Sequence, residues 1–231
     1  MSFDLRPGKL LANSLLKAGS VIVLILLTVS LAFGFDFDRL QKTLIQKFGT
    51  SSVRLLQDWK TLLSDTKSLP EPDKLKQINE FFNRKITFSD DQVVWGKADY
   101  WATPLEIIGK DAGDCEDFVI AKYFSLKEIG VPIQKLRLTY VRAKIGGPSS
   151  TITQAHMVLA YYATPESEPL VLDNLISDIR PASRRPDLAP IFSFNSDGIW
   201  AAGSTAPASN SVDRLSRWKD LLLRMQAEGF D

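Results

Sequence analysis

Apolar and polar residues follow two different periods along this chain, and the period changes near residue 134. Between residues 38 and 64, apolar side chains recur at helical spacing with a break near Gly49, which predicts two amphipathic helices. After a proline-rich break, Asp73 is a candidate N-cap for a third helix that extends to about Lys85. The first part of the chain is therefore expected to form a helical lobe.

Two further helices are predicted from the residues at their starts. Thr103, Pro104 and Glu106 supply an N-cap, a first-turn proline and a capping-box partner for a short helix. A Gly-Asp turn then leads into a mostly apolar helix that begins near Cys115 and stops before residue 130. Because this second helix is apolar on most sides, we expect it to be buried.

Beyond residue 134 the pattern changes to that of β-strands. Consecutive antiparallel strands are predicted over residues 135–144, 154–162 and 169–173, with a further short strand in 191–194 or 198–201. An amphipathic pattern over residues 212–226 predicts a closing helix. The predicted fold class is α+β, with helices first and then an antiparallel sheet on which the Cys115 helix packs.

The N-terminal segment reads as a targeting signal. Basic residues precede an apolar run over residues 21–33, and the small residues Ser30 and Ala32 occupy the positions that a signal peptidase inspects. The run is shorter than the roughly 20 residues needed to cross a bilayer, so we expect residues 1–32 to be a cleaved signal peptide, with an uncleaved anchor as the alternative. Residues 33–231 are then expected to form a single domain.

Composition narrows the possible functions. The net charge is +1 from 28 basic and 27 acidic residues, so nucleic acid is not an expected partner. The chain has one cysteine, Cys115, which cannot form an intramolecular disulfide. A lone thiol in an exported protein is either a small buried apolar residue or a reactive group.

Cys115, His156 and Asp173 are the candidate catalytic residues. Cys115 begins a predicted helix, where the helix dipole and free amides favour a thiolate and can hold an oxyanion. His156 is the only histidine in the chain, so it is the only imidazole that can act as the base. The order Cys, His, Asp is that of papain-like triads. Each residue also has an ordinary structural interpretation, as a packed side chain or a turn residue.

The predicted hairpin offers a way to bring His156 and Asp173 together. If its loop is 163–166, Tyr162 pairs with Ser167, and the same register places His156 directly opposite Asp173. A slip of one residue would turn Asp173 to the other face of the sheet.

Acidic residues surround the cysteine and need an explanation. Asp114, Glu116 and Asp117 place negative charge beside a sulfur that must itself become negative. One interpretation is that they complement the helix N-terminus. The other is that they bind a hard cation, most plausibly Ca²⁺, with Asp111 as a possible further ligand.

Three sequence blocks in order resemble the bacterial transglutaminase-like cysteine proteinases, specifically the LapG-type periplasmic proteases. The blocks are Gly113-Asp-Cys-Glu-Asp-Phe118, Gln154-Ala-His-Met-Val158 and Leu170-Val-Leu-Asp-Asn174. The resemblance implies a papain/transglutaminase-like core, with Cys115 as nucleophile, His156 as base and Asp173 as the orienting carboxylate. It also implies a calcium site on Asp114, Glu116 and Asp117.

The same resemblance implies a biological role. Members of this kind cleave large cell-surface adhesins near their N-terminus and so release cells from a biofilm. They are sequestered by the periplasmic domain of an inner-membrane receptor that senses cyclic di-GMP. Transglutaminase relatives also use a tryptophan upstream of the cysteine as an oxyanion donor, and here both Trp95 and Trp101 are candidates.

Two other functions remain open from the sequence. A transglutaminase-type acyl transferase would form the same thioester and pass it to an amine instead of water. A non-catalytic, calcium-dependent binding module would keep the residues of the triad without using them.

Overall fold

The computed structural model describes residues 34–147, 149–208 and 215–230 of the chain. The chain divides into two units, Met1–Ala32 and Phe33–Asp231, and the following account concerns the second. The predicted signal peptide and the first residues of the predicted closing helix, 212–214, lie outside the described residues. None of the helices within the described ranges combines the length and the apolar character that crossing a membrane requires.

Most of the helices precede the strands of the main sheet along the chain, as the sequence pattern predicts. The helices are α1 (Phe37–Phe48), α2 (Val53–Thr66), α3 (Glu71–Lys85), α4 (Asp91–Val94), α5 (Pro104–Lys110), α6 (Cys115–Glu128) and α7 (Ser216–Glu228), with short 3₁₀ turns at Ile133–Lys135 and Ala182–Arg184. The strands are β1 (Thr87–Phe88), β2 (Ala112–Gly113), β3 (Leu136–Lys144), β4 (Thr153–Tyr161), β5 (Leu170–Leu172), β6 (Arg180–Pro181), β7 (Leu188–Asn195) and β8 (Gly198–Ala201). The α+β prediction, with helices preceding an antiparallel sheet, is confirmed.

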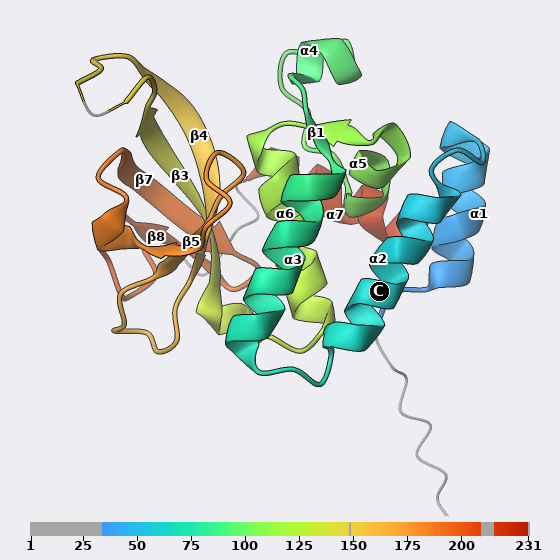
Figure 1. Cartoon of the computed structure of the whole chain (residues 1–231), viewed down its shortest axis with the longest axis horizontal. Coiled ribbons are helices and arrows are strands. Elements are labelled where there is room, and N and C mark those ends of the chain that lie inside the picture. The colour runs from blue at the N-terminus through green and yellow to red at the C-terminus, as the bar shows by residue number, and fades with distance from the viewer. Residues whose placement is uncertain (1–33, 148, 209–214, 231) are drawn as a thin grey trace, which may run out of the picture. The chain divides into compact units, whose positions relative to one another are not determined.

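A six-stranded antiparallel sheet forms one side of the domain and the helices cover one of its faces (Figure 1). The strand order is β6-β5-β4-β3-β7-β8. Alternate residues of β3 and β4, including Leu138 and Leu159, are fully buried in the main core beneath the helices. Val141 and Val158 belong instead to a second, smaller apolar cluster. The strand alternation therefore gives the sheet two apolar faces.

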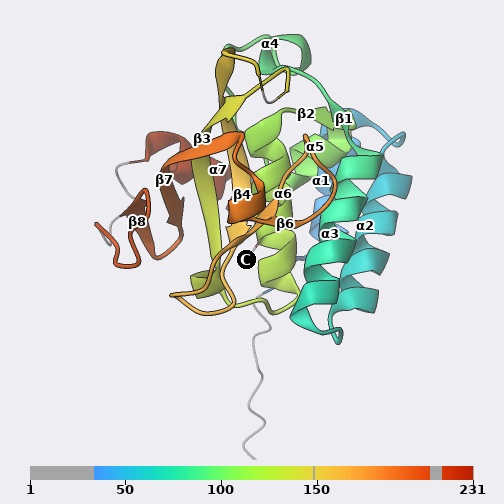
Figure 2. The same ribbon diagram turned by 60° about the vertical axis from the view of Figure 1, so that its left-hand side comes forward.

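Helix α6 lies between the sheet and the other helices (Figure 2). It contacts β3 and β4 on one side and α3 and α5 on the other. Nearly all its residues are buried, from Asp117 to Leu126, which is why its sequence lacks a polar face. Helix α2 is also linked to α6, because the indole Nε1 of Trp59 donates to Ser125 Oγ at 2.9 Å. The position of Cys115 is thus set by a helix that is packed on both sides.

The capping prediction for α5 is confirmed and the one for α3 is wrong. Thr103 Oγ1 accepts from the Glu106 amide at 3.1 Å, and the Glu106 carboxylate accepts from the Thr103 amide at 2.9 Å. Helix α3 begins at Glu71 and follows Pro70, so Asp73 lies within its first turn. Pro72 lies at the second helical position, where its fixed φ suits the helix and its missing N–H leaves no donor unsatisfied.

The predicted hairpin register between β4 and β5 is also wrong, by two residues. Tyr161 pairs with Leu170, so the connection covers residues 162–169 instead of 163–166. The Ser167 amide and hydroxyl both bond to the Thr164 carbonyl, closing a local turn inside the loop. Pro169 cannot donate to a strand partner, and the Tyr162 amide donates to the Lys135 carbonyl instead.

Candidate active site

Cys115 is the first residue of α6, as the sequence predicts. Asp114 precedes it as the N-cap, and the Asp114 amide donates to Asp117 Oδ2 at 3.3 Å. The other oxygen of Asp117 accepts from the Ala102 amide at 2.6 Å. Asp117 is fully buried. Its carboxylate therefore connects the start of α6 to the segment before α5.

The half-buried Cys115 sulfur lies between a carboxylate and a backbone amide. The thiol donates to Glu116 Oε2 at 2.9 Å. Burial raises the pKa of the Cys115 thiol well above its usual range, and the charges of Glu116 and Asp114 raise it further. A hydrogen bond from the backbone amide of Met157 opposes them and favours the thiolate.

His156 and Asp173 meet although the predicted register is wrong. His156 Nε2 lies 2.8 Å from Asp173 Oδ1, and both side chains are buried. Leu159 pairs with Leu172, so continuing that register places Asp173 beside Val158, two positions along from His156. A shift of two residues preserves the side-chain alternation of a strand, so the pair forms diagonally instead of directly across.

His156 lies immediately before Met157, whose backbone amide lowers the pKa of the Cys115 thiol. The start of α6 therefore lies close to β4, the strand that carries the histidine of the histidine–aspartate pair. Within the described residues, the Cys115 thiol donates to Glu116 and no hydrogen bond joins it to His156.

Arg185 is a residue of this site that sequence reasoning missed. Its Nη2 donates to Asp173 Oδ2 at 2.7 Å, and Asp187 in turn accepts from its Nε at 3.0 Å. Burial disfavours a charged Asp173, but hydrogen bonds and charge from His156, the Leu175 amide and Arg185 outweigh it and lower the pKa of Asp173 to about 2. Asp173 is therefore held as a carboxylate. Arg185 directly follows the short 3₁₀ turn Ala182–Arg184, and no sequence pattern distinguishes it.

A cluster of carboxylates surrounds the start of α6. Oxygens of Asp91, Asp114 and Asp117 lie within 4.8 Å of one another, and so do oxygens of Asp91, Asp99 and Glu116. Burial, together with the charges of Glu116, Asp117 and Asp91, raises the pKa of Asp114 to about 9. Oδ1 of Asp91 and Oδ1 of Asp114 are buried and have no hydrogen-bond partner among the described residues. Hard oxygen donors with unused lone pairs fit a cation such as Ca²⁺.

Comparison with known proteins decides the family. The family model of the bacterial transglutaminase-like cysteine proteinases (BTLCP) matches residues 60–187. Among solved structures, Legionella pneumophila LapG has a TM-score of 0.70 at 39% identity, covering 84% of this chain and 99% of that chain. The chain belongs to the bacterial transglutaminase-like cysteine proteinase family.

Two further LapG structures from Legionella pneumophila differ in their calcium treatment. An EGTA-treated form has a TM-score of 0.72 at 39% identity, covering 84% of this chain and all of that chain, 100%. A calcium-bound form has a TM-score of 0.70 at 40% identity, covering 82% of this chain and 98% of that chain. Comparison with curated proteins gives no match. A solved relative of this cysteine proteinase therefore exists with bound calcium.

Asp91 is the member of the carboxylate cluster that sequence reasoning missed in this proteinase. It lies more than 20 residues before Cys115, and the short parallel pair of β1 and β2 brings it there. The Ser89 amide donates to the Gly113 carbonyl at 2.9 Å, which places the segment before α4 alongside the turn before α6. Asp111, the possible further ligand, instead ends α5 in the left-handed conformation, with φ 52°, and is not part of the cluster among the described residues.

The two candidate tryptophans occupy different surroundings. Trp101 is buried and stacks on Phe194, with ring centroids 5.8 Å apart, and also contacts Tyr140. Trp95 packs on Tyr100 at 4.8 Å. Both indole N–H groups are buried and lack a hydrogen-bond partner among the described residues, so neither arrangement selects one tryptophan as the oxyanion donor.

Proposed function

We propose that this chain is a calcium-dependent cysteine endopeptidase of the periplasm that cleaves a large cell-surface adhesin near its N-terminus and so controls release from a biofilm. A cyclic-di-GMP receptor of the inner membrane would regulate it through its periplasmic domain. The resemblance of the three sequence blocks to LapG-type proteases supports this role, as does the structural similarity to LapG over most of the chain.

One observation carries the proposed chemistry. The backbone amide of Met157 favours the Cys115 thiolate, and the residue before Met157 is a histidine whose Nε2 is bonded to a buried aspartate. Since Nε2 of His156 is engaged with Asp173, Nδ1 is the nitrogen left to receive the thiol proton. Nucleophilic catalysis would then require the Cys115 thiol to turn from Glu116 to this nitrogen.

The proposed reaction follows from these groups. His156 Nδ1 takes the proton of Cys115, and the thiolate attacks the carbonyl carbon of the scissile peptide bond. The amides at the first turn of α6 hold the developing oxyanion. The imidazolium then protonates the leaving amine, giving a thioester and a free N-terminus. Water, deprotonated by His156, hydrolyses the thioester and restores the thiol.

Asp91, Asp114, Glu116 and Asp117 are the residues that would hold a calcium ion. A bound Ca²⁺ would offset the negative charge beside the Cys115 sulfur. Without such compensation, burial and the acidic neighbours hold the pKa of Cys115 high, and Glu116 accepts the thiol hydrogen. The calcium requirement is thus proposed from the charge balance around the nucleophile.

A cleavage assay on cell-surface proteins tests the proposal. Wild-type protein with Ca²⁺ is expected to release a fragment of a large surface protein, whereas Cys115→Ala and chelator-treated wild type are expected to release none. Covalently crosslinked products without fragments would instead identify a transglutaminase-type acyl transferase. If wild type and Cys115→Ala release the same fragments or none, the protein is not a cysteine protease, and the interpretation as a non-catalytic binding module is favoured.

A further inference from the structure

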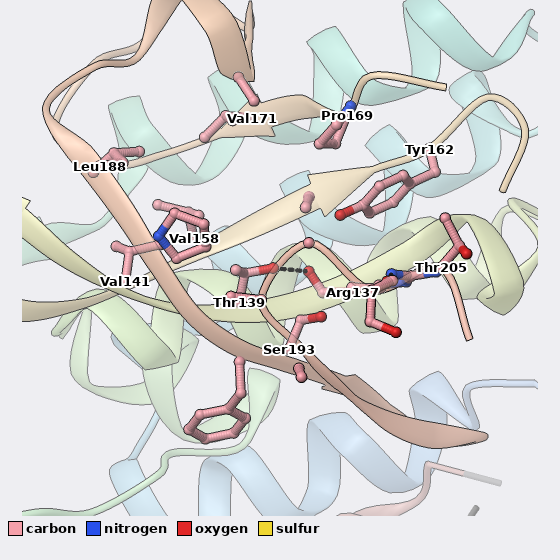
Figure 3. Close-up of a pocket in the computed structure, with 18 of the residues that line it drawn as sticks. Arg137, Thr139, Val141, Val158, Tyr162, Pro169, Val171, Leu188, Ser193 and Thr205 are labelled. Atoms are coloured by element: carbon pink, nitrogen blue, oxygen red, sulfur yellow. Dashed lines mark hydrogen bonds between the residues drawn. The ribbon is translucent and has the colours of Figure 1, made fainter. Parts of the chain in front are cut away.

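A cavity of about 340 Å³ lies on the face of the sheet that the helices do not cover. Its walls come from β3, β4, β5, β7 and the loop after β8, as Figure 3 shows. This size is within the range of small-molecule sites in proteins. Cys115, His156 and Asp173 do not line the cavity, although Arg185, which bonds to Asp173, does.

One end of the cavity is apolar. Val141, Val158 and Val171 form the smaller apolar cluster of the domain, and Leu188 packs against them. Figure 3 shows these four side chains gathered on one side of the cavity, away from Arg137 and its neighbours. A hydrocarbon chain placed on them would be removed from water, which favours an apolar ligand group at this end.

The other end holds Arg137, for which the described residues provide no counter-ion. Arg137 is 5% exposed, and its guanidinium carbon lies 4.4 Å from the ring centroid of Tyr162 and 4.3 Å from that of Trp200. Nη1 donates to the Ser204 carbonyl at 3.2 Å, whereas Nε is buried and has no hydrogen-bond partner among the described residues.

In the described part of the chain, no carboxylate lies within ion-pair distance of Arg137. Glu166 lines the same cavity but is exposed and does not reach the guanidinium. Arg185 also lines it, yet Asp173 and Asp187 already balance its charge. A buried cation without a partner is unfavourable, and an anion that binds it gains a charge-assisted hydrogen bond. Arg137 therefore selects for negative charge.

We propose that this cavity binds an amphipathic monocarboxylate, with its carboxylate on Arg137 and a medium-length aliphatic chain over the valine cluster. The apolar wall excludes a ligand that is charged throughout, and the single unpaired guanidinium matches a single negative charge. The proposal does not rest on the proposed protease reaction, and occupancy of the cavity is measurable without any substrate.

Calorimetric titration of the purified full chain with decanoate, below its micelle concentration, tests the proposal. Decan-1-ol and decyltrimethylammonium are the matched probes, since they keep the chain and change the charge of the head group. We expect saturable binding of one decanoate per chain, with at least about tenfold weaker binding of the other two probes. Failure of decanoate to bind, or equal binding of the cationic probe, would overturn the proposal.

Variants locate the site. Arg137→Met keeps the length of the side chain between the two aromatic rings and is expected to weaken decanoate binding at least about tenfold. Arg142→Met, an exposed residue of the same strand that does not line the cavity, is the control and is expected to bind as wild type does. If Arg137→Met does not fold, Val158→Phe, which fills the apolar end, is expected to abolish binding. Undiminished binding by the folded variant that is tested would refute the assignment.

Discussion

The buried Asp173 carboxylate is bonded to one side chain that titrates and one that does not. His156 occupies Oδ1, and Arg185, which stays charged at any working pH, occupies Oδ2. The Asp173 carbonyl also accepts from Asn83 Nδ2 at 2.7 Å, so the residue is held at several points. We infer that Arg185 acts as a positioning residue, because it determines which oxygen of Asp173 remains for the histidine.

Replacing Arg185 tests this role. Arg185→Met leaves Asp173 Oδ2 without its donor, and we expect kcat to fall roughly 10- to 100-fold with little change in KM, since outer partners of a catalytic group typically have effects of this size. Arg180→Met removes an exposed arginine from its pair with Asp178 and serves as the control. An unchanged kcat in a folded Arg185→Met protein would show that Asp173 needs no such support.

Lys122 is a buried basic residue whose charged form is unfavourable in the core. It is fully buried on α6, and its Nζ has no hydrogen-bond partner among the described residues. Burial lowers the pKa of Lys122 to about 7, although the charge of Asp173 opposes the shift. The unfolded chain retains this proton up to about pH 10.4, so the free energy of unfolding should rise between about pH 7 and 10.

Lys122→Met is therefore expected to stabilise the domain at pH 7, by on the order of 2–4 kcal/mol, because it removes the buried charge and keeps the apolar stem. Urea unfolding measured from pH 6 to 10 should show the rise in wild type and a flatter profile in the variant. Lys127→Met, an exposed lysine of the same helix, is the control. Parallel profiles for wild type and Lys122→Met would contradict the assignment.

Among the contacts between elements, Arg224 of α7 bonds to Glu106 of α5. Arg224 Nη1 donates to Glu106 Oε2 at 2.5 Å, and its Nη2 donates to the Trp101 carbonyl at 2.6 Å. Glu106 is also the capping-box partner of Thr103, so the same carboxylate serves both helices. The closing helix thus supports the segment that precedes α6.

Removing this arginine should destabilise the domain. Arg224→Met leaves the buried Glu106 with hydrogen bonds from Tyr100 and Thr103 and with Lys47, at 3.6 Å, as its remaining cationic neighbour among the described residues. We expect a loss of about 2–3 kcal/mol in the free energy of unfolding. Arg217→Met, in the same helix and paired with Asp99 at the surface, should cost less than about 1 kcal/mol. If urea unfolding shows that the two variants lose the same free energy of unfolding, the contacts of Arg224 with Glu106 stabilise the domain no more than a surface ion pair does.

Most elements were predictable because their signals are local. The capping box of Thr103 and Glu106 and the apolar periods of α1, α2 and α6 lie within a few residues of each other. The β4–β5 register was not predictable, since it depends on a turn between Thr164 and Ser167 that competes with strand pairing. Asp91 and Arg185 were missed because only the tertiary fold brings them to the site. The resemblance implied that the carboxylates next to Cys115 bind calcium, and it did not point to the distant Asp91.

At the scale of the whole molecule, the carboxylate cluster joins segments that are far apart in sequence, and its charge should make stability depend on calcium. Because a ligand that binds only the folded state stabilises it, Ca²⁺ at about 100 times its Kd should add roughly 2.7 kcal/mol. Asp91→Asn removes one charge from the cluster and should shift the calcium dependence of Tm to higher concentration. Asp90→Asn changes an exposed neighbour and should leave that dependence unaltered. If neither Ca²⁺ nor chelator changes the Tm, the carboxylate cluster does not bind calcium.

The central claim is that His156 activates Cys115 as a nucleophile. The most direct measurement is the rate of Cys115 alkylation by iodoacetamide from pH 5 to 10, with saturating Ca²⁺, in wild type and His156→Ala. Wild type is expected to react rapidly at neutral pH, and His156→Ala at least about tenfold more slowly there, approaching the wild-type rate only at alkaline pH, where an unassisted thiol ionises. Superimposable pH profiles for the two proteins would contradict it.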